Sequence, residues 1–462
     1  MGLAVTVSVL ALSAAQAQEG SAVVQFPNGG VYEGTLLEGR PHGQGVYTLP
    51  NGLRYEGQWQ NGAQTGEGRA QMPSGSVYEG AFLDGLPHGE GQHTAIDGTV
   101  MVGTWVGGKL TGEGSTTYPD GSVYKGAYLN DLFHGQGQLT MPDGYVYEGG
   151  WEAGQKSGLG KITYADGSTY EGEMSLNQRN GRGKLTSVDG YVLDGQWVGN
   201  EITGEGTLTF ADGTVYTGTL VGGTRSGLGK TVYATGDSYD GTYENGVMQG
   251  RGVWTGVDGT VYEGDWLAGK YHGEGVLTYP DGSEYRGTFV EDFPHGFGRM
   301  AFATGDVYEG DWQVGVMHGQ GKSVLTDGTT YEGGFAEGLR QGKGKLTIPD
   351  GYSYDGDWVA GLREGMGKAQ LADGSTYEGS FKADLYDGEG TFVLPDFLVY
   401  TGQWKSGIFD GFGRMEYATG DVYEGEFSAG QRNGEGTLTY ADGTVLKAQW
   451  QGNNVVTQVS TE

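Results

Sequence analysis

The amino-acid sequence predicts an all-β protein, an elongated single-layer meander of about nineteen tandem β-hairpins in one twisted antiparallel sheet. Three observations predict this fold. A Tyr-Glu-Gly motif recurs every 23 residues, glycine accounts for 95 of 462 residues, and apolar and polar residues alternate within each repeat. A fixed period of about 20–50 residues is typical of repeat architectures, and alternation with period two is typical of half-buried strands.

The repeat is described most simply by numbering each copy from its tyrosine, which we call slot zero. This slot begins at Tyr32 and advances by 23 residues through nineteen repeats, with Met101, Leu193 and Leu446 in place of tyrosine. Slot two is glycine in every repeat except the incomplete last one, which has Ala448, and slots eleven and thirteen are glycine in all eighteen repeats before it.

Two slots predict turns. Slot seven is glycine in most repeats and otherwise only Asn or Asp, the residues that tolerate a left-handed backbone, so we expect a positive φ there. Slots nineteen and twenty read Asp-Gly or a close relative, as at Asn51-Gly52 and Asp281-Gly282, which predicts two-residue hairpin turns. The exceptions at slot seven are Asp131, Asn177, Asn200, Asp292, Asp384 and Asn453.

Between these turns lie two runs that we expect to be paired strands. In the first run Tyr262, Gly264 and Trp266 share one face, and Glu263 and Asp265 point to the other. Glycines at slots two and thirteen fall on the aromatic face, where their missing side chains let neighbouring rings lie flat over the backbone. Strands spaced about 4.8 Å apart would make a rod about 180 Å long.

The motifs within one repeat carry a resemblance to a known family. Tyr-Glu-Gly-Asp-Trp at 262–266, Gly-Lys at 269–270, His-Gly-Glu-Gly at 272–275 and Asp-Gly at 281–282 closely resemble the MORN repeat. The resemblance covers roughly Phe26 to Asn453. It implies an elongated all-β array, often dimeric, that serves as a scaffold or targeting module. The family name refers to membrane occupation.

The first seventeen residues predict a signal peptide. An apolar run from Leu3 to Ala15 precedes Ala15-Gln16-Ala17, a small-x-small cleavage pattern, although no Lys or Arg stands near Met1. A short N-terminal strand or helix is the alternative interpretation. We expect cleavage after Ala17, a periplasmic or secreted protein, a repeat array over 18–453 and a tail over 454–462.

Composition and charge narrow the possible partners. A formal net charge of −31 without any Lys/Arg cluster argues against nucleic acid and disfavours anionic membrane surfaces. The sequence has no cysteine, which excludes disulfides, thiolate metal sites and a thiol nucleophile. With 12% aromatic and 36% hydrophobic residues, the chain can nevertheless bury a core.

Slot four supplies the candidate site. Trp alternates there with smaller or more flexible side chains, so the pattern repeats every 46 residues apart from one phase slip between Tyr243 and Trp266. Packing in a twisted sheet explains such alternation. The functional hypothesis is a groove for a peptide, glycan or acyl chain, because a single-layer sheet needs self-closure, a dimer partner or a ligand to cover its apolar face. The residues of this predicted aromatic groove are Trp59, Trp105, Trp151, Trp197, Trp266, Trp312, Trp358 and Trp404.

Other polar slots predict structure rather than chemistry. Successive repeats would stand about 9.6 Å apart, whereas zinc ligands lie about 2.1 Å from the metal, so histidines at slot ten cannot share an ion and are expected to hydrogen-bond the backbone. Acidic slot one and basic slot fourteen predict weak cross-strand ion pairs. No set of residues predicts a catalytic, cofactor-binding or metal site. The slot-ten histidines are His42, His88, His134, His272, His295 and His318.

These observations together favour an extracytoplasmic scaffold or protein-interaction module that is not an enzyme and needs no cofactor. Its partner is an unidentified protein or a second copy of the chain, which would pair through the aromatic face or the sheet ends. The alternative is a cell-envelope repeat protein that binds glycan or lipid in the aromatic groove, with membrane association disfavoured by charge.

Overall fold

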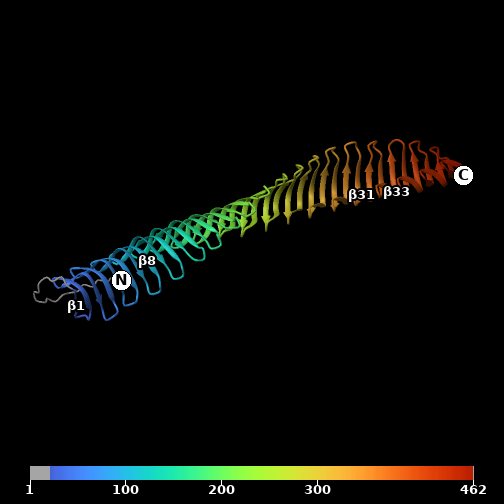
Figure 1. Cartoon of the computed structure of the whole chain (residues 1–462). Helices are drawn as coiled ribbons and strands as arrows, with labels where there is room; N and C mark the ends of the chain where they lie inside the picture. Colours follow the sequence, from blue (N-terminus) through green and yellow to red (C-terminus); the bar gives the residue numbers. More distant parts are fainter. Residues whose placement is uncertain (1–20, 461–462) are drawn as a thin grey trace. The chain divides into compact units, whose positions relative to one another are not determined.

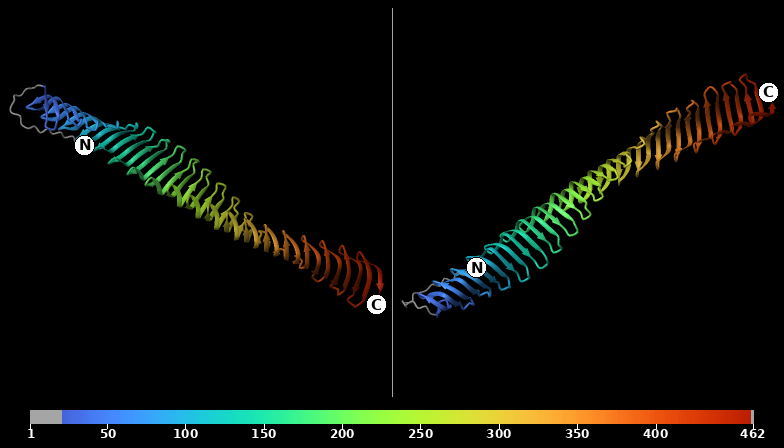
Figure 2. Two further views of the ribbon diagram at one scale, coloured as in Figure 1. Left: turned by 90° about the horizontal axis from the view of Figure 1, so that it is seen from below. Right: turned by 45° about the horizontal axis from the view of Figure 1, so that its top comes forward.

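A computed structural model describes residues 21–460, which form β-strands and turns and contain no α-helix. The predicted signal peptide, residues 1–17, lies outside this range. The chain divides into two compact units, Met1–Ala234 and Thr235–Glu462. Within each unit the strands lie side by side in a single layer (Figures 1 and 2), and nothing in the described range forms a helix that could cross a bilayer.

The strands alternate between a shorter first strand and a longer second strand of each repeat. The first unit contains β1 (Ser21–Gln25), β2 (Val31–Leu37), β3 (Arg40–Thr48), β4 (Arg54–Gln60), β5 (Ala63–Gln71), β6 (Val77–Leu83), β7 (Leu86–Thr94), β8 (Val100–Val106), β9 (Lys109–Thr117), β10 (Val123–Leu129), β11 (Leu132–Thr140), β12 (Val146–Glu152), β13 (Gln155–Thr163), β14 (Thr169–Ser175), β15 (Gln178–Thr186), β16 (Val192–Val198), β17 (Glu201–Thr209), β18 (Val215–Val221) and β19 (Thr224–Val232). The second unit contains β20 (Ser238–Glu244), β21 (Val247–Thr255), β22 (Val261–Leu267), β23 (Lys270–Thr278), β24 (Glu284–Val290), β25 (Phe293–Ala301), β26 (Val307–Gln313), β27 (Val316–Val324), β28 (Thr330–Ala336), β29 (Leu339–Thr347), β30 (Ser353–Val359), β31 (Leu362–Gln370), β32 (Thr376–Lys382), β33 (Leu385–Leu394), β34 (Leu398–Lys405), β35 (Ile408–Tyr417), β36 (Val422–Ser428), β37 (Gln431–Thr439), β38 (Val445–Gln451) and β39 (Asn454–Ser460).

Each unit is a simple antiparallel meander. Inside either unit every strand pairs with its neighbours in sequence, as β22 does with β21 and β23. The all-β fold class and the tandem hairpins are therefore confirmed. Most of the predicted tail is part of the sheet, because β39 pairs with β38.

The turn within each repeat agrees with the prediction and extends it. Leu267 pairs with Lys270, which leaves a two-residue connection in which Ala268 has φ 52° and Gly269 has φ 81°. Positive φ at both central residues defines a type I′ turn, which matches the twist of the flanking strands. The positive φ at slot seven is confirmed, and slot six adopts one as well, even where it is Leu176 or Val314.

Asn and Asp at slot seven do more than tolerate this backbone. The side-chain oxygen of Asn177 accepts the backbone N–H of Lys156, which lies at slot nine of the preceding repeat, at 2.9 Å. Asp292 does the same for Tyr271 at 2.8 Å. Each such residue therefore ties its turn to the neighbouring repeat. The complete set of acceptors is Asp131, Asn177, Asn200, Asp292, Asp384 and Asn453.

The turn between repeats corrects the two-residue prediction. In the loop after β23, the N–H of Tyr279 donates to the carbonyl of Ser283 at 2.8 Å, so three residues separate the paired ends. Gly282 has φ 88°, whereas Asp281 has no positive φ and accepts the N–H of Ser283 at 2.9 Å. This is a turn closed by a left-handed glycine, and the aspartate stabilises it through its side chain.

A bulge explains the invariant glycine at slot eleven. Gly287 pairs with Gly298 and Phe289 pairs with Pro294, so three residues of β25 oppose a single residue of β24. Gly296, in the middle of those three, has φ 68°. The extra residues bend the second strand of every repeat at the same place.

Opposed glycines at slots two and thirteen make room for the tyrosine ring, as predicted. A Cβ on Gly298 would lie 2.2 Å from the Tyr285 hydroxyl oxygen and 2.5 Å from Cζ of the same ring. The hydroxyl donates to the carbonyl of Thr288 at 3.1 Å, which satisfies the buried phenol. Tyr285 is 0% exposed although no second layer covers it.

Slot four completes the core. The Tyr285 ring meets Phe289 of its own repeat at 5.0 Å and Trp312 of the next repeat at 5.2 Å, both edge to face. Such contacts are favourable beyond the area that they bury. The aromatic side chains therefore form a continuous ladder in the second unit, from Tyr239 to Trp450. In the first unit the ladder is interrupted by the aliphatic side chains of Met101, Met174, Leu193 and Leu220.

Replacing Gly298 with alanine tests this packing. We expect Gly298→Ala to lower the free energy of unfolding by about 1–3 kcal/mol, because the new methyl group overlaps the Tyr285 ring. Chemical denaturation of the full chain measures this loss. Phe297→Ala, at the next position but on the opposite face, is the control and should change stability by less than about 0.5 kcal/mol.

A double-mutant cycle makes the test specific. In a Tyr285→Leu background the additional cost of Gly298→Ala should shrink, just as Ala448 occupies slot two in a repeat that carries Leu446. An equal cost in both backgrounds would show that the ring is not what excludes the side chain.

Alkaline titration tests the burial of the tyrosines. Burial raises the pKa of Tyr147, Tyr308 and Tyr331 from 10.0 to about 12. Because the folded pKa lies above the unfolded one, the stabilisation is complete below pH 10.0 and is lost as pH rises towards 12. We expect tyrosinate absorbance at 295 nm to rise together with the loss of β circular dichroism. Full ionisation near pH 10 with the sheet intact would contradict this account.

Candidate binding face

The two faces of the sheet differ in chemistry, and the predicted site residues lie on the aromatic one. The eight tryptophans of the predicted groove are between 2% and 7% exposed. Each indole N–H donates to the slot-thirteen carbonyl of the preceding repeat, as Trp266 does to Gly252 at 3.1 Å. The indoles thus belong to the core, and their burial lends no support to a ligand groove lined by these rings.

The side chains that cover the tyrosines come from slot nine. Phe133 stacks on Tyr124 with ring centroids 3.6 Å apart, and Tyr271 stacks on Tyr262 at 3.8 Å. Each tyrosine is held between glycine backbone below and a slot-nine side chain above. This arrangement is how a single layer buries its aromatic face without a partner.

Basic side chains serve the same purpose in other repeats. The guanidinium of Arg179 lies 4.3 Å from the centre of the Trp197 ring, and the ammonium of Lys156 lies 5.0 Å from that of Tyr147. Burial lowers the pKa of Lys156 and of Arg340. Cation–π attraction contributes to holding these groups over the rings.

Repeats without the tyrosine show how slot nine compensates. Where slot zero is Met101, the side chain of Leu110 at slot nine is 0% exposed and approaches the slot-two glycine directly. Ile202 does the same where slot zero is Leu193. An aliphatic slot-nine residue therefore occupies the space that the ring leaves empty.

The slot-nine side chains form a stripe along the aromatic face, which we call the slot-nine stripe. Six of its members are buried, namely Pro41, Gln64, Pro87, Leu110, Ile202 and Pro294, and the other thirteen are at least partly exposed. Its nineteen members include six cations and no Asp or Glu, in a chain with 58 acidic residues. This stripe is hard to recognise in the sequence, because the side chain at slot nine is aromatic in some repeats and aliphatic or basic in others. The signal that could have revealed it is the exclusion of acids. The stripe runs through Pro41, Gln64, Pro87, Leu110, Phe133, Lys156, Arg179, Ile202 and Arg225 in the first unit, and through Met248, Tyr271, Pro294, Met317, Arg340, Arg363, Tyr386, Phe409, Arg432 and Val455 in the second.

The opposite face is charged. The predicted cross-strand ion pairs between slots fourteen and one are present at Arg69–Glu79, Lys322–Glu332, Lys368–Glu378 and Arg414–Glu424, with distances from 2.6 to 3.9 Å. All of these groups are exposed, so each pair contributes only a few tenths of a kcal/mol. Their role is register and solvation.

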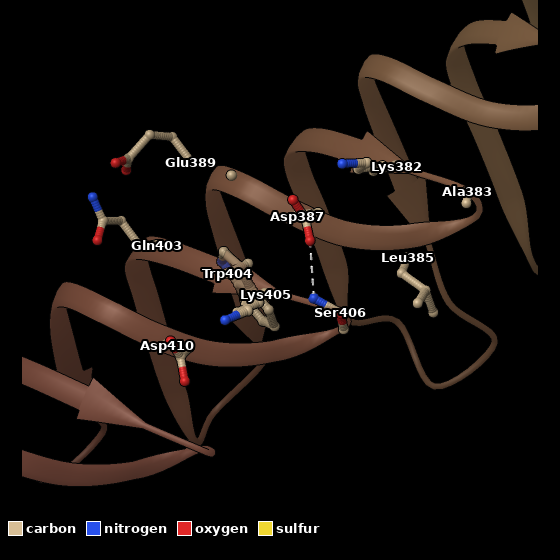
Figure 3. A pocket seen from close by; sticks show the side chains of 11 residues that line it. Lys382, Ala383, Leu385, Asp387, Glu389, Gln403, Trp404, Lys405, Ser406 and Asp410 are labelled. Carbon is tan, nitrogen blue, oxygen red and sulfur yellow. Dashed lines mark hydrogen bonds between the residues drawn. The ribbon is translucent and has the colours of Figure 1, made fainter.

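Acidic residues at slot ten also have structural partners. A hollow of about 680 Å³ lies beside the turns after β32 and β34. Figure 3 shows the side chains that line it, among them Lys382, Asp387, Lys405 and Asp410. Asp387 accepts the N–H of Ser406 at 3.1 Å, and Asp410 accepts that of Ala429 at 3.2 Å. These carboxylates stabilise the turn of the following repeat.

The histidines at slot ten do not behave as predicted. Their backbone carbonyls accept hydrogen bonds, as His272 does from the Tyr262 hydroxyl at 3.2 Å, but within residues 21–460 their rings form none. Nδ1 of His42 is buried without a partner. In the same range no three His, Asp or Glu side chains converge as metal ligands.

Comparisons with solved structures give only distant likenesses. The TCP10 domain of Danio rerio CPAP is 14% identical over 45% of this chain and 99% of that one, with a TM-score of 0.27. The TCP10c domain of Drosophila melanogaster Sas-4 is 13% identical over 44% and 99%, with a TM-score of 0.19. A streptogramin B lyase is 12% identical over 74% and 92%, with a TM-score of 0.12. Scores this low carry no argument about function.

The comparison with protein families, unlike the comparison with solved structures, shows the family of the chain. No curated protein matches the chain. The MORN repeat matches residues 32–54, 55–77, 78–100, 102–123, 124–144, 147–169, 170–190, 194–215, 216–238, 239–261, 262–284, 285–307, 308–330, 331–351, 354–376, 377–398, 400–422 and 423–445. These segments cover most of the chain and keep the predicted 23-residue register. The chain therefore belongs to the MORN repeat family.

Proposed function

We propose that this protein is a non-catalytic extracytoplasmic scaffold that binds a protein partner along the slot-nine stripe. The observation that carries this proposal is the stripe itself, which combines aromatic, aliphatic and basic side chains and excludes acids. Aromatic residues, Met and Arg are the residue types enriched where proteins bind each other. Slot nine has no acidic side chain in any repeat and has a cation in six of them, which suits an extended partner segment with apolar and acidic residues.

The burial of the tryptophans bears on the alternative function. Glycan binding of the kind considered for the predicted groove needs exposed ring faces, and at most 7% of any of its eight indoles is accessible. Protein binding through the covering side chains of slot nine needs no such exposure. Self-association through the sheet ends stays a prediction.

The proposed location rests on the apolar run from Leu3 to Ala15 and the Ala15-Gln16-Ala17 pattern. Residues 1–25 fused to alkaline phosphatase, which is active only outside the cytoplasm, should give an active fusion whose mature N-terminus is Gln18. A fusion without residues 3–15 is the control. An uncleaved, inactive fusion would place the protein inside the cell.

Photo-crosslinking in cells tests the binding face. Benzoylphenylalanine in place of Phe133 or Tyr271 keeps an aromatic ring on the stripe, and we expect it to form adducts with one discrete partner. Gln136 and Glu274 lie on the charged face nearby and provide matched control positions. Adducts formed only from the control positions, or from all four alike, would refute the assignment of the face.

A further inference from the structure

The aromatic face of the second unit contains one hollow that the repeat pattern does not explain. It has a volume of about 590 Å³ and lies over Tyr308. Slot fifteen is Ser323 in this repeat, whereas the repeats on either side have Met300 and Leu346. The small serine leaves open the space that the methionine or leucine side chain fills in the adjacent repeats.

The lining of this hollow is mostly apolar and extends across repeats. Phe302, Met317, Leu325 and Phe335 contribute apolar side chains. The lining residues come from five successive repeats, between the loop at Asp281 and the turn at Gly361. The hollow is therefore a trench across several strands, and it suits an extended apolar chain better than a compact ligand.

A guanidinium without an acceptor stands at one wall of the trench. Arg340 is half-buried, and its guanidinium lies 5.0 Å from the ring centres of both Tyr331 and Trp358. Within residues 21–460 it forms no hydrogen bond or ion pair. The donors of this guanidinium are therefore available to an anionic ligand, and Asp384 is a carboxylate whose charge also acts on it.

The other slot-nine arginines of this unit show why Arg340 differs. Arg363 pairs with Asp384 at 3.0 Å, and Arg432 donates to the carbonyl of Asn453 at 3.4 Å. Both acceptors occupy slot seven of the following repeat. After Arg340 that slot is Gly361, which offers no carboxylate like that of Asp384, whereas the acceptor of Arg432 is a backbone carbonyl.

The remaining charges of the trench lie at its opposite wall and are already engaged. Asp281 accepts the N–H of Ser283 at 2.9 Å, and Asp306 accepts that of Thr326 at 2.9 Å. These hydrogen bonds lower the pKa of both carboxyls, so they remain ionised and held to their loops. An anionic group in the trench would therefore lie at the Arg340 end.

We propose that this trench binds an unbranched apolar carboxylate, such as a medium-chain fatty acid. The carboxylate accepts hydrogen bonds from the Arg340 guanidinium in a bidentate arrangement, which carboxylate and guanidinium geometries favour. The hydrocarbon chain lies over Met317 and Phe335 towards Phe302. The site does not depend on the protein partner proposed above.

Titration calorimetry of the full chain with decanoate, decanol and decyltrimethylammonium, below their micelle concentrations in 0.15 M salt, tests the site. We expect saturable one-site binding of decanoate, at least tenfold weaker binding of decanol, and no binding of the cation. Equal binding of decanoate and decanol would overturn the role of Arg340. Non-saturable binding of all three compounds would show only adventitious apolar contact and would refute a specific site.

Two variants and a control locate the binding. Arg340→Gln should weaken decanoate binding about tenfold or more, because a charge-assisted hydrogen bond is lost. Ser323→Leu should abolish binding while the melting temperature is unchanged or higher, because leucine fills the hollow as Leu346 does in the next repeat. Arg432→Gln, which alters a partnered arginine of the same unit, should leave the affinity unchanged. Unaltered affinity in Arg340→Gln and Ser323→Leu would refute the proposal.

A peptide comparison decides between sources of the carboxylate. N-acetyl-Leu-Phe with a free C-terminal carboxylate should bind more weakly than decanoate if the trench is built for an extended hydrocarbon chain. Tighter binding of the peptide acid than of decanoate, with loss of binding for the peptide amide, would overturn the fatty-acid assignment in favour of a polypeptide C-terminus.

Discussion

A tyrosine ring lying flat on two opposed glycines is the contact on which the rest of this structure depends. A Cβ at slot thirteen would overlap the ring, and a Cβ at slot two would lie only 2.3–3.0 Å from the Cα of the opposed glycine, so slots two and thirteen hardly vary. The one alanine at slot two, Ala448, occurs in a repeat whose slot zero is Leu446 rather than tyrosine. With the ring held this close to the backbone, a slot-nine side chain is enough to cover it. Each unit can therefore bury an aromatic core in one layer of strands.

In this arrangement the residues that stabilise the fold differ from the residues that are available to bind a partner. Slots zero, two, four and thirteen form a nearly uniform core, and slot nine covers that core with side chains whose only common requirement is to lie over the ring. Phenylalanine, arginine, proline and methionine all meet it. The chemistry of the outer face can therefore vary from repeat to repeat without changing the fold, and the charged face opposite keeps the sheet solvated and in register.

The periodic features were predictable from the sequence, because they need only the strand period and the conformational limits of glycine. The 23-residue hairpins, the positive φ at slot seven and the aromatic face with its bare glycines belong to this group. Features that depend on exact strand pairing were not. The bulge at Gly296 brings the slot-nine side chain over the slot-zero ring. The sequence spacing alone therefore does not predict that Phe133 stacks on Tyr124. The sequence does not reveal that slot-nine side chains bury the tryptophans of slot four. These tryptophans therefore resemble exposed ligand-binding residues when only the sequence is considered. The trench at Ser323 likewise requires knowing that slots nine and fifteen share one surface.

Hydroxyl-radical footprinting of the isolated chain, read by mass spectrometry, tests most directly whether a single layer buries its own rings. We expect the tyrosines of slot zero and the tryptophans of slot four to be protected from oxidation. The exposed Phe297 and Phe412 of the opposite face should react readily. Oxidation of Tyr262 and Trp266 at the rate measured for the unfolded chain would contradict this expectation.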